Sequence, residues 1–204
     1  MDQTQFERLA AEGYDKVAVM RTILSDYDTP LSVYHKVANA PYTYLLESVQ
    51  GGDQWGRYSI IGLPCRQRVS VTGSMVSVTE RSAEGEETLV EQQATQDPLA
   101  WLEAFQARFK VPEQNGLPVF TGGLVGYFGY DSIEYVEPRL RETTPERDDI
   151  GAPDIVMMVS TELVVFDNLS GQVHVIVHAD LTQNQAWPKA QTRLDEIAAR
   201  IHAP

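Results

Sequence analysis

Residues 67–80, QRVSVTGSMVSVTE, decide the fold class of this chain. Apolar and polar residues alternate on both sides of Gly73 and Ser74. Alternation with a period of two is typical of half-buried strands, and a short connection containing glycine favours an antiparallel hairpin between them. The sequence therefore predicts a sheet built from hairpins in this part of the chain.

Further strands and helices are predicted on both sides of this hairpin. Strands are expected at residues 17–24, 43–49, 58–61, 122–130, 155–166 and 173–177, and helices at residues 4–13, 31–37, 98–110 and 190–201. The most apolar run, residues 155–166, is expected to form a second hairpin with residues 173–177. The sequence thus predicts an α+β fold with sandwich-like antiparallel sheets and flanking helices, in a single domain over residues 1–204.

Charge and cysteine content exclude several classes of protein. The 204 residues include 29 acidic and 16 basic ones, for a formal net charge of -13. Because an acidic chain repels phosphate backbones and anionic lipids, neither a nucleic acid nor a membrane is expected as a partner. The single cysteine, Cys65, excludes an internal disulfide framework. No apolar run reaches the roughly 20 residues of a membrane span, and residues 1–12 lack the pattern of a signal peptide, so we expect a cytoplasmic protein.

The usual motifs of catalysis and metal binding are missing. The glycine-rich run at residues 122–131, GGLVGYFGYD, lacks the Gly-Lys-Ser/Thr of a phosphate-binding loop, and no helical pattern follows its glycines. Glycines in such a run indicate the close approach of another strand or side chain. His174 and His178 are four residues apart in a predicted strand, which separates them by roughly 13 Å and disfavours a shared metal ion.

Two stretches carry a resemblance to a known family. Residues 41–64, PYTYLLESVQGGDQWGRYSIIGLP, together with residues 122–131, resemble the N-terminal region of anthranilate synthase component I, a chorismate-utilising enzyme. LLES followed by GRYSIIG at this spacing is specific evidence for the family, whereas the glycine-rich strand alone would be weak evidence. The resemblance extends over about residues 17–201 and implies that the chain has the N-terminal half of that fold.

The resemblance also implies an activity and partners for the full protein. That protein would convert chorismate to anthranilate in tryptophan biosynthesis, with ammonia from a glutamine amidotransferase subunit (component II) and with a magnesium ion. Chorismate, the metal and the catalytic residues would lie in a C-terminal half that extends beyond these residues. We therefore expect no catalytic residue, metal ligand or cofactor in this chain, and no activity from it alone.

A site for L-tryptophan, the feedback inhibitor, is implied at the LLES segment. Its chemistry suits a free amino acid, because Glu47 can offset the ammonium charge and Ser48 can bond to the carboxylate or the amine. Leu45 and Leu46 can form a wall for the indole ring. The simpler alternative is that Glu47 is a surface residue and Ser48 an ordinary strand serine.

The next predicted strand supplies further candidates. Tyr58 and Ser59 can reach the same pocket if the two strands pair, while Arg57 either balances Glu47 or binds the ligand. The tryptophan-binding residues that we predict are Leu46, Glu47, Ser48, Tyr58 and Ser59. One tension is visible, because neighbouring residues in a regular strand point to opposite faces. Glu47 and Ser48 can serve one ligand only if the strand ends or bulges there, or if one of them acts through its backbone.

Other assignments stay open at this level. Trp55 is expected to be a packed or turn aromatic residue. Tyr127, Tyr130 and Asp131 are expected in a core, with an interface between the two halves as the alternative. The aminodeoxychorismate synthase large subunit shares the architecture, and in it bound tryptophan would be structural. A stand-alone amino-acid-binding or interaction module is the alternative without catalysis.

Overall fold

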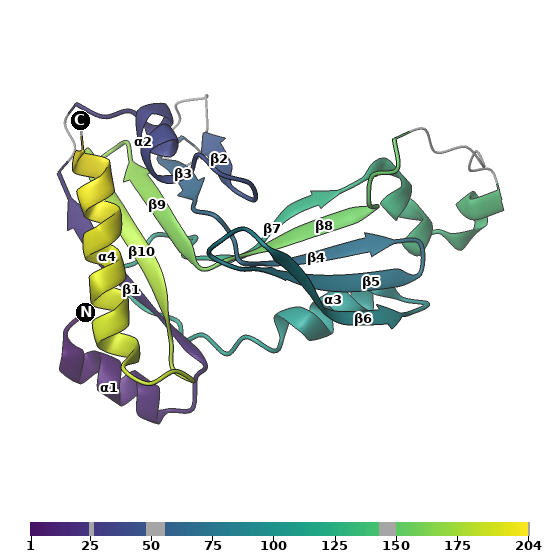
Figure 1. Ribbon diagram of the computed structural model, residues 1–204, viewed down its shortest axis with the longest axis horizontal. Helices are drawn as coiled ribbons and strands as arrows, with labels where there is room; N and C mark the ends of the chain where they lie inside the picture. The colour runs from purple at the N-terminus through teal and green to yellow at the C-terminus, as the bar shows by residue number, and fades with distance from the viewer. Residues whose placement is uncertain (25–26, 48–55, 143–149, 204) are drawn as a thin grey trace. The chain divides into compact units, whose positions relative to one another are not determined.

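The computed structural model describes residues 1–24, 27–47, 56–142 and 150–203. The chain forms two compact units, each built from separated segments (Figure 1). Unit 1 comprises Met1–Cys65, Phe109–Gly123 and Ser160–Pro204, and unit 2 comprises Arg66–Arg108 and Leu124–Val159. Each unit contains one antiparallel sheet of five strands, so the predicted α+β class with antiparallel sheets is confirmed. The single domain predicted for residues 1–204 stays a prediction.

Unit 1 contains the two strands on which the tryptophan site is predicted. Its elements are α1 (Gln3–Ala11), β1 (Lys16–Ile23), α2 (Pro30–Val37), β2 (Tyr44–Glu47), β3 (Tyr58–Gly62), β9 (Glu162–Asp167), β10 (Gln172–Asp180) and α4 (Ala186–His202). The strands are ordered β1-β10-β9-β3-β2, so β2 lies at an edge of the sheet.

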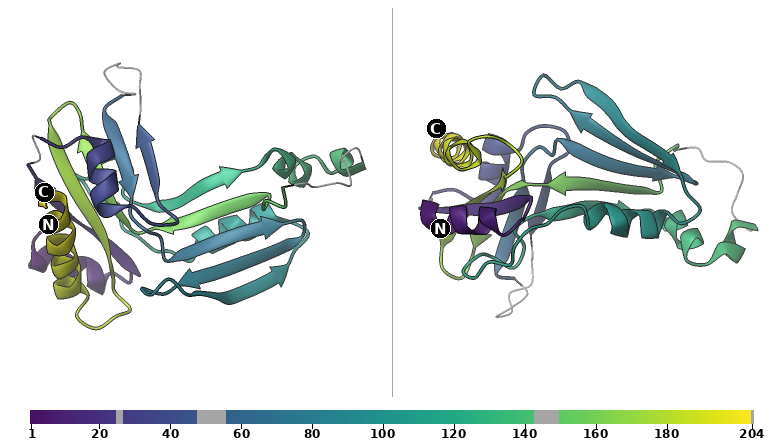
Figure 2. Two further views of the ribbon diagram at one scale, coloured as in Figure 1. Left: turned by 45° about the horizontal axis from the view of Figure 1, so that its top comes forward. Right: turned by 90° about the horizontal axis from the view of Figure 1, so that it is seen from below.

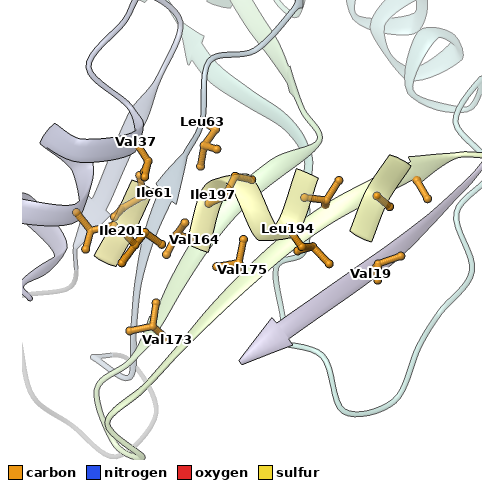
Figure 3. Packing of buried hydrophobic residues seen from close by; sticks show 14 of the residues in the cluster. Val19, Val37, Ile61, Leu63, Val164, Val173, Val175, Leu194, Ile197 and Ile201 are labelled. Carbon is orange, nitrogen blue, oxygen red and sulfur yellow. The ribbon is translucent and has the colours of Figure 1, made fainter. Parts of the chain in front are cut away.

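Helix α4 covers the core of unit 1. Its apolar residues recur every three or four positions, a spacing that places them on one face of a helix. Ala190, Leu194, Ile197 and Ile201 are all buried on this face. They join one cluster with residues of the central strands, including Val164 and Val175 (Figure 3).

The other face of the same sheet has its own apolar cluster. Ala18, Leu163 and Ile176 are buried there, and Leu117 and Phe120 from the segment Phe109–Gly123 pack against it. The same segment also protects the edge of β1. The side-chain amide of Gln114 accepts from the backbone N–H of Ala18 at 3.2 Å and donates to its carbonyl at 3.1 Å. This amide therefore takes the place of a neighbouring strand at one position of β1.

Unit 2 contains the hairpin that the sequence predicts most clearly. Its elements are β4 (Gln67–Thr72), β5 (Met75–Arg81), β6 (Glu87–Ala94), α3 (Pro98–Gln106), β7 (Gly123–Phe128), the 3-10 helices η1 (Tyr130–Tyr135) and η2 (Pro138–Glu142), and β8 (Ile155–Ser160). Strands β4 and β5 turn at Gly73, whose φ of 55° suits glycine, and the hairpin is confirmed. The strand order is β6-β5-β4-β8-β7, and α3 lies along one face of the sheet (Figure 2).

One strand prediction is wrong in its extent. The sequence predicts a single strand over residues 155–166. The structure has two strands there, β8 in the sheet of unit 2 and β9 in the sheet of unit 1. Strand β8 pairs with β4, while β9 pairs with β3 and β10. The polar residues Ser160, Thr161 and Glu162 interrupt the apolar run at the change of sheet, but both strands are largely buried, so the sequence does not show that they belong to different sheets.

The glycine-rich run of residues 122–131 behaves as predicted. A Cβ atom at Gly126 of β7 would lie 1.8 Å from the carbonyl oxygen of Val156. A Cβ atom at Gly122 would lie 2.7 Å from the carbonyl oxygen of Ser160 and 2.8 Å from Nε2 of His178. The glycines therefore permit close approach of a strand and of a side chain, and the interpretation is confirmed for these two residues.

Candidate functional site

Strands β2 and β3 lie side by side, as the LLES and GRYSIIG motifs require (Figure 2). In the antiparallel register Glu47 is opposite Ser59, Leu46 is opposite Ile60 and Tyr44 is opposite Gly62. The pairing of the two strands, on which the candidate site depends, is confirmed. Ser48 and Trp55 lie outside the described residues.

The predicted residues lie on two faces of this strand pair. Side chains directly opposite each other share a face, so Glu47 and Ser59 are together. Leu46 and Tyr58 point to the other face, because the direction of side chains alternates along a strand. Leu46 is 49% exposed and Glu47 is also exposed, whereas Ser59 is only 3% exposed. The strand pair thus has apolar side chains on one face, and the exposed Glu47 carboxylate lies on the opposite face at the end of β2.

Arg57 has a different partner from the one considered in the sequence. Its guanidinium donates to both carboxylate oxygens of Asp167, from Nε at 2.9 Å and from Nη2 at 2.5 Å. Among the ion pairs of the described residues Arg57 is joined to Asp167 and not to Glu47, so the proposed balance between Arg57 and Glu47 is wrong. The reason is geometric, since Tyr58 next to Arg57 is directly opposite Asp167 in the sheet.

Asp167 is a buried carboxylate at the end of β9, with an exposed fraction of 3%. Besides the guanidinium it accepts from the backbone N–H groups of Leu169 and Ser170, at 3.1 and 3.3 Å. The hydrogen bond from Arg57 is the main cause that holds the pKa of Asp167 far below its usual range. Sequence reasoning missed Asp167, although an aspartate that precedes Asn-Leu-Ser-Gly is a familiar start of a turn.

Asn168 links the same turn to β3. Its backbone N–H donates to the carbonyl oxygen of Arg57 at 2.8 Å. Its side-chain Nδ2 donates to the hydroxyl of Ser59 at 3.3 Å and to the carbonyl oxygen of Gly56 at 3.4 Å. The turn after β9 therefore holds the first residues of β3 in place.

The lowered pKa of Asp167 makes the stability of unit 1 depend on pH. In the unfolded chain an aspartate titrates near pH 4, so the ion pair stabilises the fold above about pH 4 and is lost as the pH falls further. Replacing Asp167 by Asn should cost about 2 kcal/mol near pH 7, the moderate value for a pair whose arginine is 40% exposed. The difference in unfolding free energy between Asp167→Asn and the wild type should shrink as the pH is lowered below 4. Urea unfolding of both proteins near pH 7 and below pH 4 measures it.

The matched control is Asp195→Asn, in a pair with Arg21 whose carboxylate is 68% exposed. Screening by water should limit its cost to less than about 0.5 kcal/mol at pH 7. An Asp167→Asn variant that unfolds like the wild type at pH 7 would contradict the assigned role of the ion pair.

A second set of polar groups, next to the strand pair, is buried and unreactive. The Tyr44 hydroxyl and the Ser160 hydroxyl are 2.7 Å apart, and burial raises the pKa of Tyr44 to about 12. Burial also raises the pKa of the Cys65 thiol to about 11. Since only a thiolate is a strong nucleophile, Cys65 is a packing residue and not a reactive one.

The histidines are held separately by their own partners. A ring nitrogen of His178 lies 2.7 Å from the carbonyl oxygen of Thr121, and Nδ1 of His174 lies 2.9 Å from the hydroxyl of Thr22. Burial lowers the pKa of both histidines. Within the described part of the chain no group of three or more His, Cys, Asp or Glu side chains is placed to hold a metal ion.

The aromatic residues after Gly126 are exposed. Tyr127 is 43% exposed, Phe128 57% and Tyr130 94%, and Asp131 is exposed as well, so the expected packing of Tyr127, Tyr130 and Asp131 in a core is wrong. Strand β7 is the last strand of its sheet, so Tyr127 and Phe128 have no neighbouring strand on one side, and Tyr130 lies after the strand, at the start of η1.

Unit 2 also has a cavity of about 420 Å³, apart from the predicted residues of unit 1. Asp131, Glu134, Tyr135 and Asp154 contribute to its lining. The Asp154 carboxylate accepts from the N–H of Gly73 at 2.7 Å and from the Tyr135 hydroxyl at 2.6 Å. These bonds are made within the protein itself and hold η1 to the turn between β4 and β5.

Comparison with known proteins tests the resemblance directly. Over 204 residues the chain is 52% identical to anthranilate synthase component 1 of Pseudomonas aeruginosa and 48% identical to that of Pseudomonas putida, with 100% of this chain and 40% of each relative covered. The resemblance to anthranilate synthase component I is confirmed. The same protein of Neisseria meningitidis serogroup B is 46% identical over 98% of the chain and 40% of its own length. No model of a known protein family matches the chain.

A solved structure of such a protein has a similar fold. The crystal structure of anthranilate synthase component I from Streptococcus pneumoniae aligns with a TM-score of 0.54 and 22% sequence identity. The alignment covers 90% of this chain and 37% of that chain. The present chain thus spans about two fifths of the length of the curated relatives that it matches. No helix of its described residues is long and apolar enough to cross a membrane.

Proposed function

We propose that this chain is the N-terminal, regulatory part of an anthranilate synthase component I. The observation that supports this best is the 52% identity to such a protein over the whole chain, the LLES and GRYSIIG strands included. The complete protein would convert chorismate to anthranilate in tryptophan biosynthesis, and this part would contribute the L-tryptophan feedback site. Catalytic residues and magnesium are assigned to the remainder of the protein, and a glutamine amidotransferase subunit is the proposed partner of the complete protein, in the cytoplasm.

The proposed ligand site uses the end of β2 and the start of β3. The Glu47 carboxylate offsets the ammonium charge of tryptophan, and Leu46 and Tyr58 supply an apolar wall for the indole. The hydroxyl groups of Ser48 and Ser59 are assigned to the polar head group. Because Glu47 and Ser59 lie on one face of the strand pair and Leu46 and Tyr58 on the other, the ligand is placed across the end of the pair, where β2 ends at Glu47 and β3 begins at Tyr58. The strand pair forms one wall of this site, and the second wall comes from the C-terminal half.

Calorimetric titration of the complete protein with L-tryptophan tests this function. Glu47→Gln should weaken binding by about tenfold or more, because a hydrogen bond to a charged group contributes roughly 1.5–3 kcal/mol and 1.4 kcal/mol is a factor of ten. The control Glu103→Gln changes an exposed glutamate of α3 in the same way and should leave the affinity within about twofold.

Two results would count against the proposal at different levels. A wild-type protein that does not bind tryptophan would refute the regulatory role. Equal affinity of wild type and Glu47→Gln would refute the site assignment alone. In the same preparation chorismate and ammonium ions should yield anthranilate, whereas aminodeoxychorismate as the product would favour the folate-pathway relative.

A further inference from the structure

A group of three residues holds the start of β3 to the turn after β9. The bidentate pair between Arg57 and Asp167 is the strongest part, and Asn168 adds hydrogen bonds to the backbone of Gly56 and Arg57 and to Ser59. We call Arg57, Asp167 and Asn168 the β3 clamp. The guanidinium also lies over the ring of Tyr58, 4.9 Å from its centre.

The β3 clamp lies where the proposed ligand strands come together. Tyr58 and Ser59 follow Arg57 directly, and Ser59 is opposite Glu47 in the register. The clamp therefore touches two of the proposed binding residues through a ring contact and a hydrogen bond. The Asp167 carboxylate itself is buried and accepts from four donors within the protein, so we assign it to the clamp and not to ligand contact.

We propose that the β3 clamp positions Tyr58 and Ser59 and thereby sets the tryptophan concentration at which the enzyme is inhibited. The inference rests on the proposed function and adds three positioning residues to it. A site that is already held in its bound geometry does not lose conformational entropy when the ligand binds. Loosening the clamp therefore lowers the affinity for tryptophan, although no contact to the ligand is removed. Arginine is required because lysine cannot reproduce two parallel hydrogen bonds to one carboxylate.

The test compares two Arg→Lys variants of the complete protein. Arg57→Lys opens the clamp. Arg193→Lys is the matched control, because Arg193 also binds both oxygens of a carboxylate, that of Glu162, and joins α4 to β9 instead of holding β3. The two arginines have similar exposed fractions, 40% and 33%.

Calorimetry should give a tryptophan dissociation constant about tenfold higher for Arg57→Lys and within about twofold of wild type for Arg193→Lys. Asn168→Ala, which leaves the ion pair in place, should raise the constant severalfold and provides a second reading if Arg57→Lys folds poorly. Thermal unfolding of each variant is measured alongside, because a purely structural role would lower the unfolding temperature of Arg57→Lys and Arg193→Lys alike.

The calorimetric results separate the clamp from the tryptophan site itself. A selective loss of affinity in Arg57→Lys and Asn168→Ala supports the clamp. Unchanged affinity in both, or an equal loss in Arg193→Lys, overturns it while the tryptophan site stands. A wild-type protein without tryptophan binding removes the proposed function and the clamp with it.

Discussion

The Gly126→Ala variant should lose about 3 kcal/mol of unfolding free energy in unit 2, the upper part of the range for an overpacked site. The added methyl group would lie 1.8 Å from the carbonyl oxygen of Val156, far inside van der Waals contact. Because the obstacle is backbone of β8, a side-chain rotation cannot relieve it, and β7 has to move away from its neighbour. Urea unfolding followed by circular dichroism measures the loss.

The control for Gly126→Ala adds volume to a strand where space is open. Ala94→Val enlarges an exposed residue at the end of the edge strand β6 and should change the unfolding free energy by less than about 0.5 kcal/mol. If Gly126→Ala is as stable as the wild type, the close approach of β7 and β8 is not present in solution.

Truncation of Leu194 to alanine should destabilise unit 1 by about 4 kcal/mol. The side chain is 1% exposed in the core beneath α4, so its removal takes away buried apolar surface and leaves a cavity among Val175, Ile197 and their neighbours. Denaturant unfolding of the variant, monitored at the far-ultraviolet helix signal, gives the value.

Leu169→Ala deletes the same atoms at a position that is 74% exposed, in the turn between β9 and β10. This control should cost no more than about 0.5 kcal/mol. Equal losses in the two variants would mean that α4 does not bury Leu194 against the sheet.

Local sequence patterns predicted the helices and strands better than they predicted which strands pair with each other. The hairpin around Gly73 and helix α4 follow from alternation and from helical spacing, which act over a few residues. Ser160, Thr161 and Glu162 separate the two apolar stretches of β8 and β9, but the sequence could not assign them to different sheets, because apolar residues show that strands are buried and not which sheet buries them. The two compact units are also invisible in the sequence, since neither is a continuous segment with a linker beside it.

The candidate site shows the same division. The LLES and GRYSIIG motifs identified two strands that do pair, and their register follows from the structure alone. The partner of Arg57 could not be found from spacing, because Asp167 is far away in the chain and reaches it only through the pairing of β3 with β9. Tyr127 was misplaced because an aromatic residue in a strand suits a core and an exposed edge equally well, and Tyr130 because the strand ends before it and η1 begins there.

The pairing of β1 with β10 has a consequence for synthesis of the protein on the ribosome. Lys16 pairs with Asp180, so the second strand leaves the exit tunnel long after the first. At about 5–20 residues per second, the nascent β1 waits on the order of ten seconds for its partner. During that interval Val17 and Val19, which end up buried, face water. The emerging N-terminal segment is therefore expected to depend on chaperones that bind nascent chains.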